Sequence, residues 1–435
     1  MTKRNTTPAS AYLRLLMGAV SAGLAALSVV EPQNWNMVVL TIGVTEWGHV
    51  VATLGLAPLL PGWRRERAAL IGGLLGLAAT TLAISPLLRA TQIGQRLPAR
   101  LAAAFGDAAP RSLPGAPPRP APLVVRDVLH GVQLSPVRKD RMTYVDRDGL
   151  ALALDLYRPD NGRRTTDDDQ DLGLGTRDVG LAADGDAQAP SPKPQAPSPK
   201  PQGAYGPAPC VVVVHGGAWR SGDCEQLPAL NGYLAARGYV VAAINYRLLP
   251  DHPFPAGRDD VLAAIDYLKA NAGDMGVDPQ RIVLLGRSAG GQLALLVAYT
   301  ANDPAIRGAI AFYPPTDLVY GYYHPAKKEI IDGILVIESY LGGSPTSAPD
   351  AYAAAAPISF AGAGCPPTLL IHGGRDNLVA PVQSERLAAR LAAAGCRHLY
   401  LSLPWAHHAC DANFSGPSGQ ISTYAIERFL AAATR

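Results

Sequence analysis

Residues 281–291 read Arg-Ile-Val-Leu-Leu-Gly-Arg-Ser-Ala-Gly-Gly, and this stretch decides the fold. Its apolar first half is typical of a buried strand, and the small residues that follow predict a sharp turn into a helix over 290–300. The pentapeptide at 286–290 matches the pattern Gly-x-Ser-x-Gly, in which small neighbours allow a strained backbone to present a serine. In a chain with 44 glycines the pentapeptide alone is weak evidence, but its place between a strand and a helix makes Ser288 a candidate nucleophile.

Alternating strand and helix patterns extend over the rest of the C-terminal half. Short apolar runs rich in β-branched residues occur at 211–214, 240–243, 282–285, 309–312, 368–371 and 399–401. Helical stretches separate them at 227–237, 257–270, 290–300, 382–394 and 420–433. Continuous apolar strands joined by crossover helices predict a mostly parallel central sheet with helices on both faces. Upstream, the runs 142–145 and 150–157 flank a turn and predict a hairpin that adds an antiparallel edge.

A glycine-rich segment follows the strand at 211–214. Residues 215–219 read His-Gly-Gly-Ala-Trp. Glycines at this place allow backbone amides to point into an open site, where they can stabilise a developing oxyanion. The expected donors are the amides of Gly217 and Ala218, together with that of Ala289 beside the candidate nucleophile. The alternative is an ordinary turn from strand to loop.

An acid and two histidines follow the last two strands. Asp376 comes after the strand at 368–371, and His407 and His408 lie in the loop after the strand at 399–401. A serine hydroxyl needs a base to take its proton, and the order serine, acid, histidine along the chain is typical of this strand–turn–helix motif. Because the carboxyl ends of parallel strands meet at one edge, we expect these groups to lie together.

Taken together, these motifs resemble the hormone-sensitive-lipase-like and acetyl-esterase branch of the α/β-hydrolases. The resemblance is carried by the segments 215–219, 245–248, 254–256 with Asp260, 286–291 and 373–379. It implies an α/β-hydrolase domain over 141–435 that cleaves carboxylic esters with short or medium acyl chains through an acyl-enzyme, without a metal or an organic cofactor. By the same match, Ser288, Asp376 and His408 would form a Ser-His-Asp triad.

Two departures from the family pattern leave alternatives open. Ala218 stands where a third glycine is usual, as in feruloyl-esterase-like, formamidase-like and prenylcysteine-methylesterase-like relatives. Ala409 and Cys410 replace the glycine and aromatic residue that usually follow the histidine, which bears on the choice between His407 and His408. An amidase, formamidase, prenylcysteine-methylesterase-like or peptidase activity on the same triad is therefore an alternative. A ligand-binding homologue without activity is another, although such homologues usually lack one member of the triad.

The net charge and the cysteine spacing of the chain indicate which partners it is not expected to bind. The formal net charge of +3, with scattered basic residues, does not indicate nucleic-acid binding. The five cysteines show no C-x-x-C spacing, so no zinc site is expected.

The segment 317–360 contains several tyrosines and lies where a lid would cross the site. They would either shape an apolar acyl pocket or pack the lid onto the body of the domain.

The first 90 residues are predicted to form a membrane anchor. Three apolar stretches, at 11–30, 37–60 and 68–88, each reach the ~20 residues that cross a bilayer. A signal peptide at the first stretch, or three buried helices, are the alternatives. Glu46 and His49 share one helix face in the second stretch and are interpreted as holding the helices together, by pairing with each other or with Arg14.

The remaining segments connect these parts. Residues 91–140 are expected to be a connector with little regular structure beyond a short helix near 97–105. Residues 160–207 contain an acidic run and a tandem Ala-Pro-Ser-Pro-Lys-Pro-Gln repeat, which predicts a disordered insertion. The basic residues at 3–4 and 64–67 favour a cytoplasmic amino terminus, so three crossings would place the hydrolase domain outside the cytoplasm. That compartment would permit a disulfide between Cys365 and Cys396.

Overall fold

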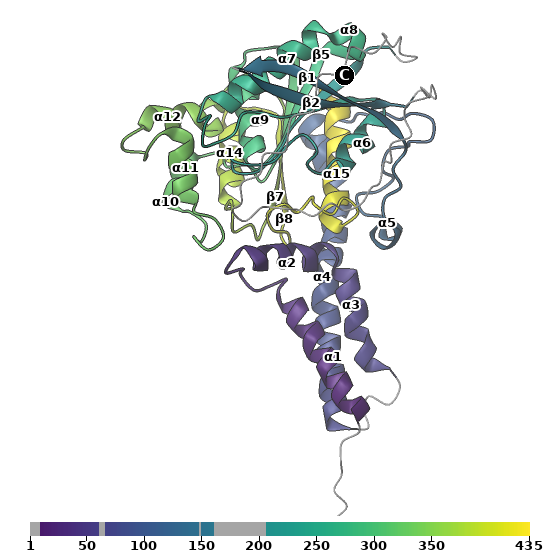
Figure 1. The fold of residues 1–435 in the computed structure, drawn as a ribbon. Helices are drawn as coiled ribbons and strands as arrows, with labels where there is room; N and C mark the ends of the chain where they lie inside the picture. The colour runs from purple at the N-terminus through teal and green to yellow at the C-terminus, as the bar shows by residue number, and fades with distance from the viewer. Residues whose placement is uncertain (1–8, 61–65, 148, 161–205) are drawn as a thin grey trace, which may run out of the picture.

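The computed structural model describes residues 9–60, 66–147, 149–160 and 206–435. The insertion predicted at 160–207 lies outside the described residues, apart from its two ends. The described chain forms an α/β domain and a stalk of helices that meets the domain at one side (Figure 1).

An eight-stranded sheet forms the centre of the domain, with the strand order β1-β2-β4-β3-β5-β6-β7-β8. The strands are β1 (Val137–Arg147), β2 (Leu150–Pro159), β3 (Ala208–Val214), β4 (Val240–Ile244), β5 (Val277–Arg287), β6 (Ile306–Phe312), β7 (Thr368–Gly373) and β8 (His398–Leu403). β2 pairs antiparallel with β1 and with β4, and the other pairs are parallel. The predicted mostly parallel sheet with an antiparallel edge hairpin is therefore confirmed.

Helices cover both faces of the sheet because successive strand residues point to opposite sides and both sides are apolar. In β3, Val212 and Val214 belong to the same core cluster as residues of α7 (Ala256–Ala270), α9 (Ala289–Thr300) and α14 (Val382–Ala393). Val211 and Val213 face the other side and belong to a cluster with α6 (Ala229–Ala235) and α15 (Pro417–Ala433). Burial of β3 on both sides holds its carboxyl end in place at the centre of the domain.

Four short helices lie between β6 and β7, in the segment predicted to be a lid. They are α10 (Leu318–Tyr323), α11 (Gly333–Leu341), α12 (Pro349–Ala355) and α13 (Pro357–Phe360). Tyr340 of α11 stacks on Trp219, with 4.2 Å between the ring centroids. This contact joins the segment to the loop that follows β3.

The stalk contains α1 (Ala9–Ala26), α3 (Gly48–Leu56) with the 3-10 turn η1 (Ala57–Leu59), and the first half of α4 (Arg67–Phe105). Glycine allows close packing here: a Cβ atom at Gly18 would lie 2.1 Å from the carbonyl oxygen of Gly72. The outward side of the stalk exposes large apolar side chains, among them Leu13, Leu16, Val20, Ile71 and Leu74. By length and composition, α1 and α4 are each able to cross a membrane.

The second predicted span, residues 37–60, is not one helix. It is divided into α2 (Trp35–Glu46) and the α3–η1 pair, which meet at an angle of 76°. The prediction of three continuous transmembrane helices is therefore wrong: two helices are long enough, and a third span exists only if the bent pair is counted as one. The bend places α2 across the base of the domain, beside the loops at the ends of β7 and β8 (Figure 1).

Polar groups explain this bend. The carboxyl group of Glu46 is fully buried and accepts hydrogen bonds from the amide and hydroxyl of Ser418, in the hydrolase domain. The expected partners His49 and Arg14 do not fill this role, since Arg14 instead donates to the carbonyl oxygens of Pro58 and Leu60. A buried carboxyl group needs such partners, and α2 finds them only by lying on the domain.

The third predicted span and the connector after it also differ from expectation. α4 continues without a break from residue 67 to residue 105, through Pro86 and Pro98. Apolar or small residues return every three to four positions along one face of its second half, and burial of that face against α15 and β8 outweighs the loss of a hydrogen bond at each proline. Phe105, for example, packs edge-to-face on Phe429 at 4.9 Å. A single helix therefore joins the stalk rigidly to the domain.

Candidate active site

Ser288 lies at the sharp turn between β5 and α9. Its backbone has φ 52° and ψ −120°, a strained conformation that is rare outside functional sites. The glycines on either side make the turn possible: a Cβ atom at Gly286 would lie 2.0 Å from the carbonyl oxygen of Gly290, and one at Gly290 would lie 2.2 Å from that of His215. The hydroxyl group of Ser288 is therefore presented at the carboxyl edge of the sheet, where its side chain is partly exposed.

The side chain of His408 reaches this serine, and the side chain of Asp376 reaches His408. Nε2 of His408 lies 3.0 Å from Oγ of Ser288, and Nδ1 of His408 lies 2.7 Å from Oδ2 of Asp376. Asp376 follows β7 and His408 lies in the loop after β8, so the parallel register of β5, β6, β7 and β8 brings the three groups to one edge. All three residues of the predicted triad are thus joined by hydrogen bonds.

The environment of Asp376 favours its ionised form. Burial by itself raises the pKa of this carboxyl group, but His408 and His372 together hold the pKa well below its usual range. Oδ1 also accepts hydrogen bonds from the amides of Leu378 and Val379, each at 2.9 Å. A carboxylate held in this way fixes the orientation of the His408 ring and keeps a proton on its Nδ1.

His407 has a different environment from its neighbour. It is 2% exposed, and burial lowers its pKa to about 4. Among the described residues, His408 and not His407 forms the hydrogen bonds to Ser288 and Asp376. The structure therefore distinguishes the two adjacent histidines, because the side chain of His408 is joined to Ser288 and Asp376 and that of His407 is not.

The predicted oxyanion loop passes directly beside the serine. A Cβ atom at Gly216 would lie 3.4 Å from Cβ of Ser288. Gly217 has φ 124° and Ala218 has φ 54°, so both amides are turned out of the extended direction of β3. Within the described part of the chain, neither amide takes part in a backbone hydrogen bond. Gly217 and Ala218 therefore retain free donors next to Ser288, and Ala289 begins the helix that follows the serine.

Side-chain hydrogen bonds hold this loop rigid. The amide of Gly216 donates to the side-chain oxygen of Gln226 at 2.8 Å, and Nε1 of Trp219 donates to Oε1 of Gln292 at 3.0 Å. Gln292 also donates to the carbonyl oxygen of Ala355 in the lid segment. The loop is fixed before any substrate arrives, which is what electrostatic stabilisation of an oxyanion requires.

Three polar residues near the site were missed by the sequence analysis. Asp411, in the same loop as His408, accepts hydrogen bonds from Nε of Arg287 and from the hydroxyl of Tyr313, both at 2.5 Å. The Tyr313 ring contacts the His408 ring at 4.3 Å. Arg287 occupies a variable position of the Gly-x-Ser-x-Gly pattern, so only its place beside the nucleophile could have drawn attention to it.

Other acidic residues are held by structural contacts. Asp317 caps α10, where it accepts a hydrogen bond from the amide of Tyr320 at 2.9 Å, and it pairs with Arg386 at 2.7 Å. Asp260 pairs with Arg247. Among the described residues, no cluster of three or more His, Cys, Asp or Glu side chains is arranged to hold a metal ion.

Comparison with known proteins agrees with this geometry. Residues 199–391 match the BD-FAE family model. The solved structure of a bacterial heroin esterase superposes with a TM-score of 0.53 at 22% sequence identity, covering 72% of this chain and 89% of that one. The C-terminal part of the chain, together with the β1–β2 hairpin, therefore has the α/β-hydrolase fold.

Two of the curated relatives are esterases of Mycobacterium tuberculosis. Esterase LipQ is 34% identical over 218 residues, which cover 47% of this chain and 51% of LipQ. Esterase LipC is 32% identical over 243 residues, which cover 52% of this chain and 58% of LipC. The chain thus spans about half the length of the curated relatives that it matches.

Proposed function

We propose that this protein hydrolyses carboxylic esters, with Ser288 as nucleophile, His408 as general base and Asp376 as the group that orients the histidine. The observation that supports the proposal is the chain of two hydrogen bonds, at 3.0 Å and 2.7 Å, that joins the three side chains beside the Gly217–Ala218 loop. The similarity to named esterases supports an ester as the substrate.

The reaction proceeds in two halves. His408 takes the proton of Ser288 as Oγ attacks the ester carbonyl, and the amides of Gly217, Ala218 and Ala289 stabilise the oxyanion that forms. The protonated His408 then gives this proton to the leaving alkoxide, and an acyl-enzyme remains on Ser288. In the second half, His408 removes a proton from water as it attacks the acyl carbon. The carboxylic acid leaves, and the proton returns to Oγ.

Labelling with a fluorophosphonate probe tests this proposal. Ser288→Ala should remove both labelling and esterase activity, by several orders of magnitude, while the protein still folds. Labelling at another residue would contradict the assignment. A series of p-nitrophenyl esters of graded chain length, with matched anilides, distinguishes an esterase from an amidase or peptidase.

We also propose that the chain crosses the membrane three times, through α1, the bent pair of α2 and α3–η1 counted as one span, and α4, and that the hydrolase domain lies outside the cytoplasm. The apolar surface of the stalk supports the membrane location, and the lysine and arginine residues near the amino terminus support the orientation. Alkaline phosphatase fused after residue 435 should be active in cells, and green fluorescent protein at the same place should stay dark. Bright fluorescence with inactive phosphatase would place the domain inside.

A further inference from the structure

The stalk does not only carry the hydrolase domain; it contacts the edge of the domain that holds Ser288. The backbone oxygen of Glu46 accepts a hydrogen bond from Asn413 at 3.0 Å, in the loop that carries His408. Asn377, next to Asp376, donates to the carbonyl oxygen of Pro32 at 3.5 Å. The loops that follow β7 and β8 therefore both contact residues 32–46, which comprise the turn after α1 and helix α2. In Figure 1, α2 lies between the domain and the rest of the stalk, beside β7 and β8, so the edge of the sheet that carries Asp376 and His408 lies toward the stalk.

α2 has the features of a helix that lies at a bilayer surface. Its polar residues Thr41, Thr45 and Glu46 are buried against the protein, whereas Val39 and Leu40 are exposed. A tryptophan stands at each end, Trp35 as the first residue and Trp47 directly after the last. Tryptophan is enriched at the boundary between bilayer and water, and a helix that exposes apolar side chains away from the protein is stabilised when lipid covers them.

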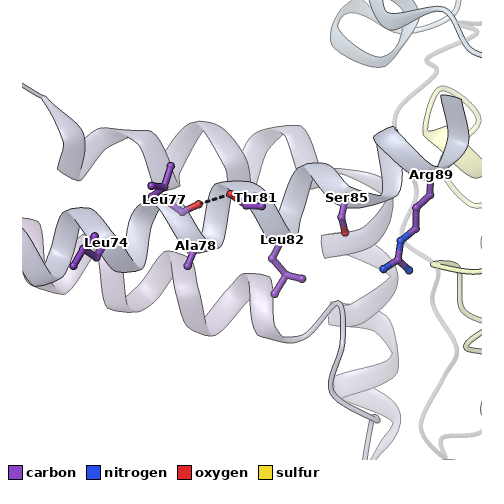
Figure 2. Close-up of a pocket in the computed structure, with 7 residues that line it drawn as sticks. All are labelled: Leu74, Leu77, Ala78, Thr81, Leu82, Ser85 and Arg89. Carbon is purple, nitrogen blue, oxygen red and sulfur yellow. Dashed lines mark hydrogen bonds between the residues drawn. The ribbon is translucent and has the colours of Figure 1, made fainter. Parts of the chain in front are cut away.

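The outward surface of α4 changes from apolar to polar near the point where α4 contacts the junction of α2 and α3. A groove along its outer side is lined by residues that share one helix face: Leu74, Leu77, Ala78, Thr81, Leu82, Ser85 and Arg89 (Figure 2). The lining is mostly apolar as far as Leu82 and ends in Ser85 and Arg89. The backbone of Ala83 packs closely against Gly48, at the junction of α2 and α3. A Cβ atom at Gly48 would lie only 2.2 Å from the carbonyl oxygen of Ala83. The apolar surface of α4 thus ends near the level at which α2 lies.

Two further parts of the domain expose apolar side chains beside α2. Lys327, in the link between α10 and α11, pairs with Glu31 at 3.0 Å, and this link is flanked by Tyr323 and Leu335, which are 57% and 54% exposed. On the other side is α5 (Val125–His130), where Leu129 is 58% exposed. The residues before and after α5 bond to the start of α15, the segment that also binds Glu46. We call these exposed side chains the base surface; they are Val39, Leu40, Trp47, Val125, Leu129, Tyr323, Ile334 and Leu335.

We infer that the base surface rests on the bilayer and that the substrate is an amphiphilic ester whose acyl chain is held in the membrane. This inference rests on the proposed ester hydrolysis at Ser288. Each methylene of an acyl chain favours the bilayer over water, so a long-chain ester is concentrated in lipid. A site at the edge of the domain that faces the bilayer receives such an ester without its passage through water. The continuous α4 helix and the buried Glu46 hold the candidate active site close to the surface of the bilayer.

Rates on two matched esters test the inference. The full chain, reconstituted in phosphatidylcholine vesicles, is given p-nitrophenyl butyrate in solution or p-nitrophenyl dodecanoate in the vesicles. Leu335→Asp and Leu129→Asp place a charge on the base surface, outside the proposed catalytic groups. Each should lower kcat/KM for the vesicle-held ester about tenfold relative to the dissolved ester. Phe360→Asp is the matched control, because Phe360 is exposed but lies near the far end of α15, with Ala432 and Ala433.

The outcomes separate the inference from the proposed function. If wild-type protein hydrolyses neither ester, the proposed function fails and the inference fails with it. If both esters are hydrolysed and the two variants change their rates no more than Phe360→Asp does, the inference alone is overturned. It is also overturned if the variants leave the ratio of rates unchanged and abolish self-association, since the base surface would then bind a second copy of the chain.

Discussion

Removal of the Glu46 carboxyl group should weaken both the fold and catalysis, although this residue belongs to the stalk. Its Oε2 accepts a hydrogen bond from the Ser418 amide at 3.2 Å, and its Oε1 accepts one from the Ser418 hydroxyl at 2.5 Å. That hydroxyl in turn accepts a hydrogen bond from Nε1 of Trp405 at 2.9 Å. Trp405 and His408 lie in the same loop, so the stalk supports the position of the proposed general base.

The expected magnitude follows from these contacts. Glu46→Ala leaves the buried Ser418 amide without an acceptor, which costs ~1–3 kcal/mol of unfolding free energy. The deleted side-chain atoms leave a cavity that adds about 1 kcal/mol. Because a displacement of ~1 Å at a catalytic group can cost up to about 100-fold in rate, we expect kcat to fall about tenfold, with little change in KM. Glu46→Gln keeps one acceptor and the side-chain volume, so it should show a smaller loss.

Thermal unfolding in detergent and the kinetics on p-nitrophenyl butyrate measure the two effects. A loss of ~3 kcal/mol should lower Tm by roughly 5 to 10 °C. Glu66→Ala is the control, since Glu66 is an exposed carboxylate directly before α4 and caps no amide there. If Glu46→Ala and Glu66→Ala give the same Tm and the same kcat, the reasoning that links the stalk to the His408 loop is refuted.

His408→Ala should abolish turnover, whereas His407→Ala should keep a measurable share, because only His408 bonds to Ser288 among the described residues; steady-state kinetics on one ester check this, and the reverse order would overturn the assignment. Burial lowers the pKa of His215 and of His407 from the usual 6.5 to about 4, so both stay neutral in the fold while the unfolded chain takes up protons. The unfolding free energy should therefore fall by ~2 kcal/mol for each histidine between about pH 7.5 and pH 5, as chemical denaturation can measure, and a flat profile would contradict it. Replacement of residues 160–207 by a short Gly-Ser linker should leave kcat and KM nearly unchanged, because that composition forms no core; a collapse of activity would show that the segment packs onto the domain.

Local patterns in the sequence were sufficient for the sheet and for the position of Ser288. A strand buried on both faces needs a continuous apolar run, and the turn that presents Ser288 needs glycine at positions 286 and 290, where a Cβ atom would clash with the backbone. Such requirements act within a few residues of the chain, so they appear directly in the sequence. The order serine, acid, histidine along the chain also placed Asp376 and the pair His407 and His408 after the last two strands, at the same edge of the sheet.

The tertiary structure alone decided how distant segments meet. Glu46 and Ser418 are 372 residues apart, and nothing near either residue indicates the other. The bend at Trp47, the continuation of α4 through Pro98 and the choice of His408 over His407 depend in the same way on what packs against each segment. A buried polar group must be satisfied, but any suitably placed partner satisfies it, and only the folded topology determines which partner is within reach. For that reason the candidate triad could be proposed from the sequence, whereas the contact between the site and the stalk could not.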